Sequence, residues 1–389
     1  MNILFITTRY GRGLGGRENY LWKLAQEISG VHEVRVVARF DKRINFWDSW
    51  KRFSSSQEQR SYLDGRVEVN IIGLNLFEKL WLLPVYKLHF YSAARGIAVW
   101  MFNRVFNRKL SPFIGWADVI HYDGTGMEII GYSGCSLAKR LSKPFIIVPH
   151  CHIGSWGDAS IDIELYKKAD VVIAKTEYEQ KMLQKGGITK DIVVIGNAPI
   201  LSPNCDAGQF RRRYNIEKNM VLFIARKTRR KGYYALRNAA PIVLGEIPDT
   251  SFVFMGSGES LPQGECVVEI GVADEFEKTS ALAACDVFCM PSVAEAFGIV
   301  FVEAWAMRKP VIGGDIPTLR EIVDDGRDGL LVRQNPREIA EKILFLLKNE
   351  KVRTKMGKRG KKKVEENYTW KRVVEKTEEI YRRTVGSKQ

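Results

Sequence analysis

Residues 291–312 read PSVAEAFGIVFVEAWAMRKPVI, and they contain the clearest structural pattern in the chain. The apolar run Val287–Met290 in front of them predicts a buried strand, and the residues after Gly298 predict a helix. Glu295 lies in the loop between them, and Glu303 lies about one and a half turns inside the helix. The unpaired backbone amides of the first helical turn favour an anion such as a phosphate. The stretch therefore predicts a strand–loop–helix unit of an α/β domain, with two carboxylates beside an anion site.

The alternation of strand and helix continues on both sides of this unit. Strands are predicted at Val221–Ala225, Ser251–Met255, Val267–Ile270 and Pro310–Ile312, and helices around Tyr234–Leu244, Phe276–Ala284 and Phe301–Met307. Strands that are apolar throughout are buried on both faces, as in a parallel sheet covered by helices. Residues 199–368 are therefore predicted to form a doubly wound, Rossmann-like α/β domain.

The first half of the chain repeats the pattern and predicts a second domain of the same kind, residues 1–198. Its predicted strands are Asn2–Thr7, Val34–Ala38, Val67–Ile72, Val119–His121, Phe145–Val148, Val171–Ala174 and Val193–Ile195, with a helix at Glu18–Ser29. The segment Asn197–Asn204 is predicted to be the hinge, and residues 369–389 a basic terminal helix. Ligands of open parallel sheets bind at the carboxyl ends of the strands, so two such domains facing each other predict a cleft.

Basic residues follow the first strand of the second domain. The strand VLFIA leads into RKTRRKG, which places Arg226 and Lys231 on a strand-to-helix loop. A guanidinium binds two phosphate oxygens at once and an ammonium adds a point charge, so the pair suits a diphosphate. Glu295 and Glu303 suit a sugar nucleotide, because carboxylates accept paired hydrogen bonds from vicinal hydroxyl groups. The alternatives are a solvated basic loop and two acids that only complement the helix dipole.

A glycine-rich loop lies between the first strand and the first helix of the chain. It reads GRGLGG and matches G-x-G-x-x-G at Gly11, Gly13 and Gly16. Its backbone amides favour a phosphate, so the loop alone is compatible with an NAD(P) site in which Asp41 binds the ribose. The motif is weak by itself, and a purely structural turn is the other interpretation.

The positive charge of the chain is concentrated in two segments. The formal net charge is +15, and residues 351–389 contain 14 basic and 5 acidic side chains. Residues 76–110 contain six basic residues and one acidic residue, so the remainder of the chain is close to neutral. Two localised basic stripes indicate an acidic partner, which is a nucleic acid, an anionic lipid or a phosphorylated substrate. The alternative is a solvated helix face.

The composition excludes several classes of protein. With 45% apolar and 27% charged residues among 389, the chain is neither disordered nor collagen-like and is long enough for two or three domains. No apolar run approaches the ~20 residues that span a bilayer. The N-terminus MNILFITTRYG predicts a strand rather than a signal peptide, and six scattered cysteines form no disulfide framework. These features predict a cytoplasmic protein.

The order Arg, Lys, Glu, Glu at positions 226, 231, 295 and 303 resembles that of the retaining glycosyltransferases of the large family four, GT4. Further matching motifs are GLGGRENYLWKLA at 13–25, KPFIIVPH at 143–150, ADVVIAKTE at 169–177 and FMGSGE at 254–259. The resemblance covers nearly the whole chain. It implies the GT-B fold, in which two Rossmann-like domains face a cleft and a C-terminal helix, here residues 369–389, crosses back to the first domain.

The resemblance also implies the site residues. The implied catalytic residues are Glu295 and His150, and the implied donor-binding residues are Gly15, Gly16, Arg226, Lys231, Gly271, Phe297, Gly298, Ile299 and Glu303. The sequence departs from the family pattern at Ala225 and Ala296, where glycines are usual, but neither small side chain should block the backbone amides.

The reaction that the resemblance implies is the transfer of a hexose from a nucleoside-diphosphate sugar to a hydroxyl of a glycan or lipid-linked acceptor, with retention of the anomeric configuration. No Asp-x-Asp pair occurs in the sequence, so no metal and no cofactor are predicted. Residues 150–152 read HCH, but neighbouring residues at a strand end point in opposite directions, which argues against a metal site. A sugar-nucleotide epimerase with the GT-B fold and an NAD(P)-dependent oxidoreductase are the alternatives.

Aromatic and basic residues are interleaved between Leu76 and Leu110, where Trp81 and Trp100 lie among lysines and arginines. Such a mixture docks helices on an anionic membrane surface, although apolar helix faces also simply cover a sheet. The first interpretation predicts peripheral attachment to the inner face of the cell membrane and a lipid-linked acceptor. No nucleic acid is predicted as a partner, because binding to nucleic acid would not require the two glutamates.

Overall fold

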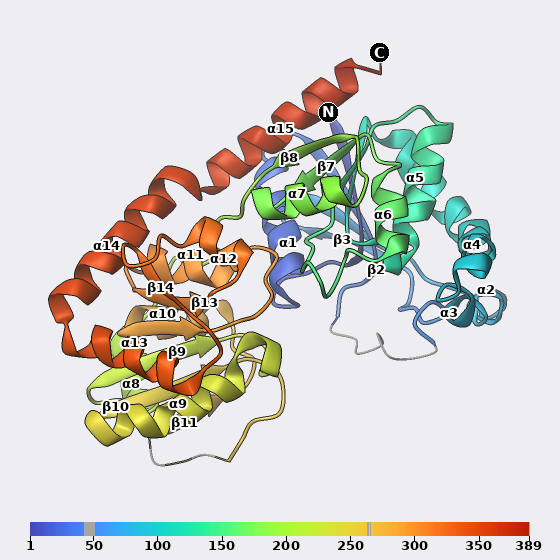
Figure 1. Ribbon diagram of the computed structural model, residues 1–389. Helices are drawn as coiled ribbons and strands as arrows, with labels where there is room; N and C mark the ends of the chain where they lie inside the picture. Colours follow the sequence, from blue (N-terminus) through green and yellow to red (C-terminus); the bar gives the residue numbers. More distant parts are fainter. Residues whose placement is uncertain (43–50, 263, 265, 389) are drawn as a thin grey trace. The chain divides into compact units, whose positions relative to one another are not determined.

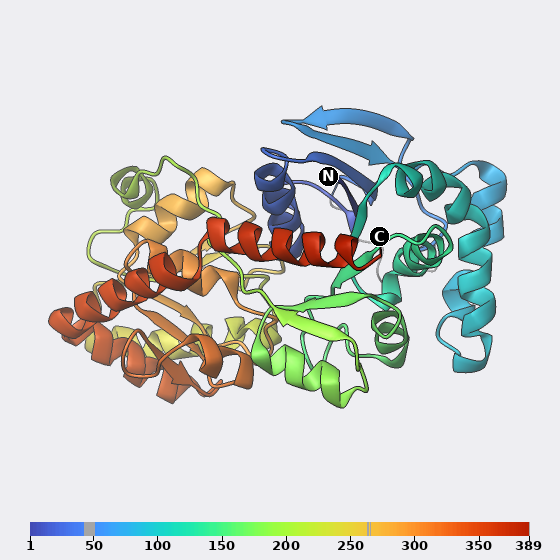
Figure 2. The same ribbon diagram turned by 90° about the horizontal axis from the view of Figure 1, so that it is seen from above.

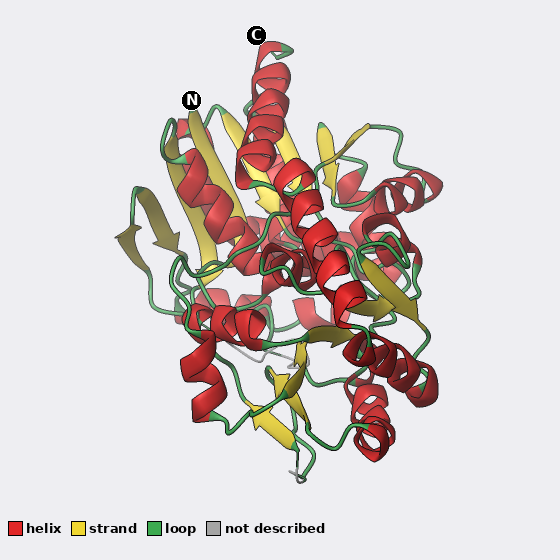
Figure 3. Cartoon of the chain, turned by 90° about the vertical axis from the view of Figure 1, so that its left-hand side faces the viewer, coloured by secondary structure: helices red, strands yellow, loops and turns green. Residues whose placement is uncertain are grey.

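The computed structural model describes residues 1–42, 51–262, 264 and 266–388, and it divides into two compact units. The first unit contains Met1–Ile195 and Val373–Gln389, and the second contains Gly196–Arg372. Each unit is built on a parallel or mostly parallel sheet with helices packed around it (Figures 1 and 3). The predicted fold class, α/β with two Rossmann-like units, is confirmed.

The sheet of the first unit has eight strands in the order β3-β4-β2-β1-β5-β6-β7-β8. The strands are β1 (Asn2–Arg9), β2 (Glu33–Phe40), β3 (Arg60–Asp64), β4 (Val67–Ile71), β5 (Val119–Asp123), β6 (Phe145–Val148), β7 (Val171–Ala174) and β8 (Asp191–Val194). Within this sheet β3 pairs antiparallel with β4, and the other pairs are parallel. The sequence predicts every strand except β3, because RSYLD is an edge strand without a buried face and carries no apolar run.

The helices of the first unit are α1 (Gly16–Ile28), α2 (Leu76–Leu82), α3 (Val85–Leu88), α4 (Arg95–Trp116), α5 (Ile130–Arg140), α6 (Ser160–Tyr166), α7 (Glu177–Lys185) and most of α15 (Trp370–Gly386). One stripe of α15 is buried, including Val373, Thr377 and Tyr381. The Tyr381 hydroxyl lies 2.6 Å from Nδ1 of His121 on β5, so the terminal helix is bonded to the central part of this sheet. In the described part of the chain, no helix combines the length and apolarity needed to cross a bilayer.

The sheet of the second unit has six parallel strands in the order β11-β10-β9-β12-β13-β14. The strands are β9 (Asn219–Ile224), β10 (Thr250–Met255), β11 (Val267–Ile270), β12 (Val287–Met290), β13 (Val311–Gly314) and β14 (Gly329–Val332). The helices are α8 (Ala207–Arg213), α9 (Tyr233–Glu246), α10 (Glu275–Ala284), α11 (Ile299–Ala306), α12 (Pro317–Ile322), α13 (Pro336–Lys348) and α14 (Glu350–Asn367). The sequence does not predict β14, an edge strand that reads GLLV and offers only three apolar residues after a glycine.

The segment Asn197–Asn204, which the sequence predicts as a hinge, is hydrogen-bonded within the second unit. The backbone N–H of Ser202 donates to Oγ1 of Thr279 on α10 at 2.9 Å. The indole N–H of Trp370 donates to the carbonyl of Pro199, also at 2.9 Å. These bonds attach the segment to the unit that follows it in the chain.

Candidate active site

Two loops of the second unit meet at the carboxyl ends of β9 and β12. The backbone N–H of Val293 donates to the carbonyl of Arg230 at 2.9 Å. The side-chain amide of Gln334, which follows β14, donates to the carbonyls of Arg230 and Pro291 at 3.3 and 2.7 Å. One side chain therefore ties both loops together. The sequence does not single out Gln334, because a lone glutamine carries no recognisable signature.

Lys231 and Glu295 form an ion pair between these loops. Nζ of Lys231 lies 2.7 Å from Oε1 of Glu295. The Glu295 side chain is only 6% exposed, whereas that of Lys231 is 23% exposed. The backbone carbonyl of Glu295 accepts a hydrogen bond from Oγ1 of Thr318 at 3.1 Å, which fixes the loop beneath it. The pair uses one of the three protons of the ammonium group, which remains partly open to solvent.

Two neighbouring basic residues in the loop after β9 have different environments. Arg226 is exposed, whereas Lys227 is buried and lies 2.8 Å from Oε2 of Glu269. A Cβ at Gly256 would lie 2.0 Å from the carbonyl oxygen of Ala225, and Gly256 has a φ of 140°, so glycine is required for this approach. The Lys227 side chain is therefore used in an ion pair within the protein, whereas the Arg226 side chain is accessible to a ligand.

Helix α11 begins at Ile299, directly after the loop that carries Glu295. Gly298 caps the helix in the left-handed conformation, with a φ of 86°. Phe297 is buried, and its ring centroid lies 5.5 Å from that of Tyr368. Because the helix starts after the glycine, the unpaired N–H groups of its first turn come within a few residues of Glu295 along the chain.

Glu303 lies on α11 and is held by the protein at one carboxylate oxygen. Its Oε1 accepts hydrogen bonds from Nζ of Lys278 at 2.7 Å and from the backbone N–H of Ile200 at 3.3 Å. Burial raises the pKa of Glu303 above its ordinary value, and the nearby Lys278 cation opposes that shift. The sequence predicts Glu303 but not Lys278, which lies on α10, 25 residues earlier in the chain.

Gly271 follows β11 at the edge of the same sheet. Its carbonyl accepts a hydrogen bond from the backbone N–H of Gly256 at 3.0 Å. The position where a Cβ would stand at Gly271 has no heavy atom within 4 Å. The space beside the Gly271 backbone, where other residues carry a side chain, is therefore open.

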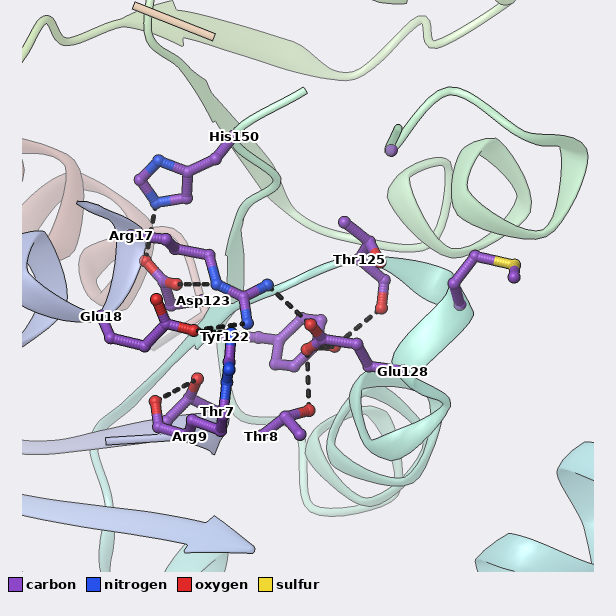
Figure 4. Close-up of polar contacts among 12 residues, drawn as sticks. Thr7, Thr8, Arg9, Arg17, Glu18, Tyr122, Asp123, Thr125, Glu128 and His150 are labelled. Carbon is purple, nitrogen blue, oxygen red and sulfur yellow. Dashed lines mark hydrogen bonds and ion pairs between the residues drawn. The ribbon is translucent and has the colours of Figure 1, made fainter. Parts of the chain in front are cut away.

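The first unit brings a separate group of charged side chains to the carboxyl ends of its strands (Figure 4). His150 follows β6, and its Nε2 lies 2.9 Å from Oδ2 of Asp123, the last residue of β5. Burial lowers the pKa of His150, against the opposing effect of Asp123. Burial by itself would raise the pKa of Asp123, but His150 and Arg17 outweigh it and the pKa is lowered. A neutral imidazole therefore donates its Nε2 proton to an ionised carboxylate.

Arg17, which follows the glycine-rich loop on the first turn of α1, also belongs to this group. Its guanidinium lies 2.6 Å from Oε1 of Glu128 and 3.6 Å from Oδ1 of Asp123 (Figure 4). Glu128 also accepts a hydrogen bond from Oγ1 of Thr8 at 2.8 Å. The carboxylates of Asp123 and Glu128 are thus connected through one arginine, which the sequence pattern does not identify.

The predicted glycines Gly15 and Gly16 lie in the same unit as His150. Gly15 caps α1 in an extended conformation, and Gly16 is the first residue of that helix. A Cβ at Gly15 would lie 2.5 Å from Oε2 of Glu18, so the absent side chain leaves room for that carboxylate. Of the predicted site residues, His150, Gly15 and Gly16 belong to the first unit, and the others belong to the second.

Lys175, directly after β7, is a buried cation that the sequence does not single out as functional. Its side chain is 1% exposed, and Nζ lies 3.5 Å from the centroid of the Tyr20 ring. Within the described residues, no acceptor forms a hydrogen bond with Nζ. Burial lowers its pKa to about 7, although the charges of Asp123 and Glu179 oppose this shift.

The His150–His152 triplet is not assembled as a ligand set. His150 is bonded to Asp123, and Sγ of Cys151 lies 3.0 Å from the carbonyl of Gly157. Across the described ranges, no three His, Cys, Asp or Glu side chains are grouped so as to hold a metal ion.

Part of the chain is similar to known glycosyltransferases. Residues 206–363 match the family model described as "Glycosyl transferases group 1". The chain is 28% identical over 270 residues to an uncharacterized glycosyltransferase of Methanocaldococcus jannaschii, covering 64% of this chain and 72% of that protein. It is 30% identical over 188 residues to the phosphatidyl-myo-inositol mannosyltransferase of Mycobacterium tuberculosis, covering 45% of this chain and 50% of that protein.

The solved structures show the fold over the whole chain. The Anabaena protein HepE, solved in complex with UDP-glucose, superposes with a TM-score of 0.75 at 18% identity, covering 98% of this chain and 99% of that one. The fold is therefore GT-B. The enzyme class that the family model and the named relatives support is glycosyltransferase, and they favour it over an epimerase or an oxidoreductase.

Proposed function

We propose that the protein is a retaining glycosyltransferase of the GT4 type, which transfers a hexose from a nucleoside-diphosphate sugar to a hydroxyl of a glycan or lipid-linked acceptor. The Lys231–Glu295 ion pair beside the start of α11 is the observation that carries the proposal. Both residues lie within the segment 206–363 that matches the glycosyltransferase family model. The named mannosyltransferase relative and the UDP-glucose complex of HepE support a sugar-nucleotide donor.

In this proposal the second unit binds the donor diphosphate. The exposed guanidinium of Arg226 and the remaining protons of the Lys231 ammonium neutralise the phosphate oxygens. The backbone N–H groups of Phe297, Gly298 and Ile299 bind the distal phosphate. These donors supply the electrostatic stabilisation without a metal ion or another cofactor.

The nucleoside and the sugar are assigned to the flanking groups. Both protein contacts of Glu303 fall on Oε1, which leaves Oε2 to accept hydrogen bonds from the ribose hydroxyls. The open backbone at Gly271 suits a flat base. In the first unit, Gly15 and Gly16 approach the donor phosphates and His150 contacts the sugar.

The catalytic task is to stabilise a departing diphosphate while an oxocarbenium-like sugar forms. Arg226, Lys231 and the α11 amides interact most strongly when negative charge accumulates on the leaving oxygens, and that selectivity for the transition state lowers the barrier. The acceptor hydroxyl attacks from the face that the diphosphate leaves, and a phosphate oxygen takes its proton. Glu295 orients the donor hydroxyl groups and forms no covalent intermediate.

A panel of UDP-, GDP- and ADP-sugars tests the proposal, with release of nucleoside diphosphate measured in the presence and absence of EDTA. Release from one donor class, undiminished by EDTA, is the expected result. An α-linked product from an α-linked donor, seen from its anomeric proton in NMR, would establish retention. Interconversion of free sugar nucleotides with no nucleoside diphosphate released would identify an epimerase instead.

A further inference from the structure

Exposed large hydrophobic side chains are concentrated in one short part of the first unit. Eighteen of them are exposed in the described chain, and eight of these fall within residues 76–100. The eight, with their exposed fractions, are Leu76 (68%), Phe77 (81%), Leu80 (55%), Trp81 (41%), Phe90 (55%), Tyr91 (67%), Ile97 (53%) and Trp100 (57%). Isolated exposed apolar residues are ordinary, but a contiguous group of them marks a site of interaction.

The exposed residues of α2 and α4 form one surface. The ring centroids of Trp81 on α2 and Trp100 on α4 lie 5.8 Å apart, and the Trp81 indole N–H donates to the carbonyl of Met101 at 3.0 Å. Helices α2, α3 and α4 lie beside one another at one edge of the first unit (Figures 1 and 2). We call the surface formed by Phe77, Leu80, Trp81, Ile97, Trp100, Arg104 and Arg108 the α2–α4 face.

Helix α4 has two different sides. Its buried residues, including Phe102, Phe106 and Leu110, belong to the core of the first unit. The exposed residues Ile97, Trp100, Arg104 and Arg108 follow at spacings of three and four, so they form one stripe on the opposite side. The stripe is apolar toward the N-terminus and basic toward the C-terminus. Covering the core therefore accounts for one side of α4 but leaves this stripe without a structural role.

Within residues 76–110, the exposed charged side chains are basic and the one acid is paired. Lys87, Arg104 and Arg108 are exposed. The single acid of residues 76–110, Glu78, lies 3.0 Å from Nζ of Lys109. Two copies of the chain joined through this face would bring like charges together, which disfavours self-association.

We propose that the α2–α4 face docks on the surface of an anionic phospholipid bilayer. Tryptophan and phenylalanine enter the boundary between headgroups and acyl chains, and the arginines on the same stripe contact the lipid phosphates. The proposal requires only the first unit and does not depend on the reaction proposed above. It gives the protein access to acceptors that are anchored in a membrane.

Cosedimentation of the full chain with vesicles tests the docking. One set of vesicles contains phosphatidylcholine alone, and the other contains equal parts of phosphatidylcholine and phosphatidylglycerol. Binding to the second set, weakened by added salt, is expected. Arg104→Ala/Arg108→Ala should reduce the partition coefficient about 25-fold, at about fivefold for each basic side chain removed. Phe77→Ser/Trp100→Ser should reduce it by about tenfold or more.

Matched variants on other surfaces control for charge and apolarity. Lys181→Ala/Lys185→Ala removes two exposed cations from α7, and Leu63→Ser removes an exposed apolar residue from β3. Both should bind anionic vesicles like the parent. Glu295→Gln should also do so, because its effect on transfer is separate from lipid binding. Thermal unfolding of every variant verifies that the fold is retained.

Three results would overturn the proposal. The first is no binding to anionic vesicles, and the second is equal binding to both vesicle types. The third is a dimer in sedimentation velocity without lipid that Phe77→Ser/Trp100→Ser dissociates, since that would make the face a contact between two copies.

Discussion

Nζ of Lys231 lies 2.7 Å from Oε1 of Glu295, and the two loops that carry these residues share one glutamine as a hydrogen-bond donor. The carboxylate is nearly buried, whereas the ammonium is partly exposed. Each group therefore partly neutralises the charge of the other. A substitution at either position also changes the surroundings of the remaining charge, so the two residues must be tested together as well as singly.

Glu295→Gln keeps the size of the side chain and removes its charge. We expect the rate of transfer to fall about 100-fold, because the donor hydroxyls lose the acceptor that orients them. The thermal unfolding temperature should stay close to that of the parent, since the neutral amide can still accept a hydrogen bond from Lys231. Initial rates of nucleoside-diphosphate release provide the measurement. Glu341→Gln, at an exposed glutamate of α13, is the control and should transfer normally.

Asp123→Asn tests whether Asp123 positions His150. The carboxylate raises the pKa of the imidazole against the effect of burial, so its removal should lower the pKa of His150 further. NMR titration of the histidine C2 protons measures that shift. The turnover number should fall about tenfold or more, with little change in affinity for the nucleoside diphosphate. An unchanged His150 titration would show that Asp123 has no part in setting the state of the imidazole.

Lys175→Met tests the buried lysine through the pH dependence of stability. Burial lowers the pKa of Lys175 to about 7 in the folded protein, below its ordinary value of 10.5. Between about pH 7 and pH 10.5, Lys175 therefore binds more protons in the unfolded chain than in the folded one. For this reason it makes the free energy of unfolding rise with pH, by at most about 1.4 kcal/mol per pH unit.

Since methionine does not titrate, the stability advantage of Lys175→Met should be largest at pH 7 and below. It should shrink steadily above pH 7. Denaturant unfolding of parent and variant between about pH 6 and pH 9.5 measures the difference. A difference that stays constant over this range would mean that Lys175 titrates normally in the folded protein.

Gly314→Ala tests the packing beneath the loop that carries Glu295. A Cβ at Gly314 would lie 1.8 Å from the backbone oxygen of Ser292. A backbone atom cannot move aside as the end of a flexible side chain can. The free energy of unfolding should fall by about 3 kcal/mol, as measured by denaturant unfolding. Gly245→Ala is the control, because a Cβ there meets nothing within 4 Å and helix α9 should gain roughly 0.5 kcal/mol. Equal stability of the two variants would contradict the crowding at Gly314.

The buried parallel strands could be predicted from the sequence, because strands such as VLFI and VFCM are apolar without interruption. The edge strands β3 and β14 could not, although the edge strands β8 and β11 could. Strand β3 reads RSYLD and has no buried face, and β14 reads GLLV, in which three apolar residues follow a glycine. Both depend on pairing with a neighbouring strand that their own residues do not indicate.

The candidate site shows the same division. Glu295 and Lys231 could be predicted because each follows a recognisable strand, and their positions in the loops limit where they can lie. Lys278 and Gln334 could not be predicted, because each reaches the site across a long separation in sequence. Asp123 ends a predicted strand, but only the folded sheet brings it to His150.

The central claim is that the donor diphosphate is bound by an arginine, a lysine and backbone amides without a divalent ion. Isothermal titration of UDP, GDP and ADP into the parent, Arg226→Ala and Lys231→Ala proteins, each with EDTA and with magnesium, tests it most directly. We predict that one nucleotide binds the parent equally well under both conditions and that each variant binds it about 10- to 100-fold more weakly. Binding that disappears in EDTA and returns with magnesium, or variants that bind like the parent, would contradict the account.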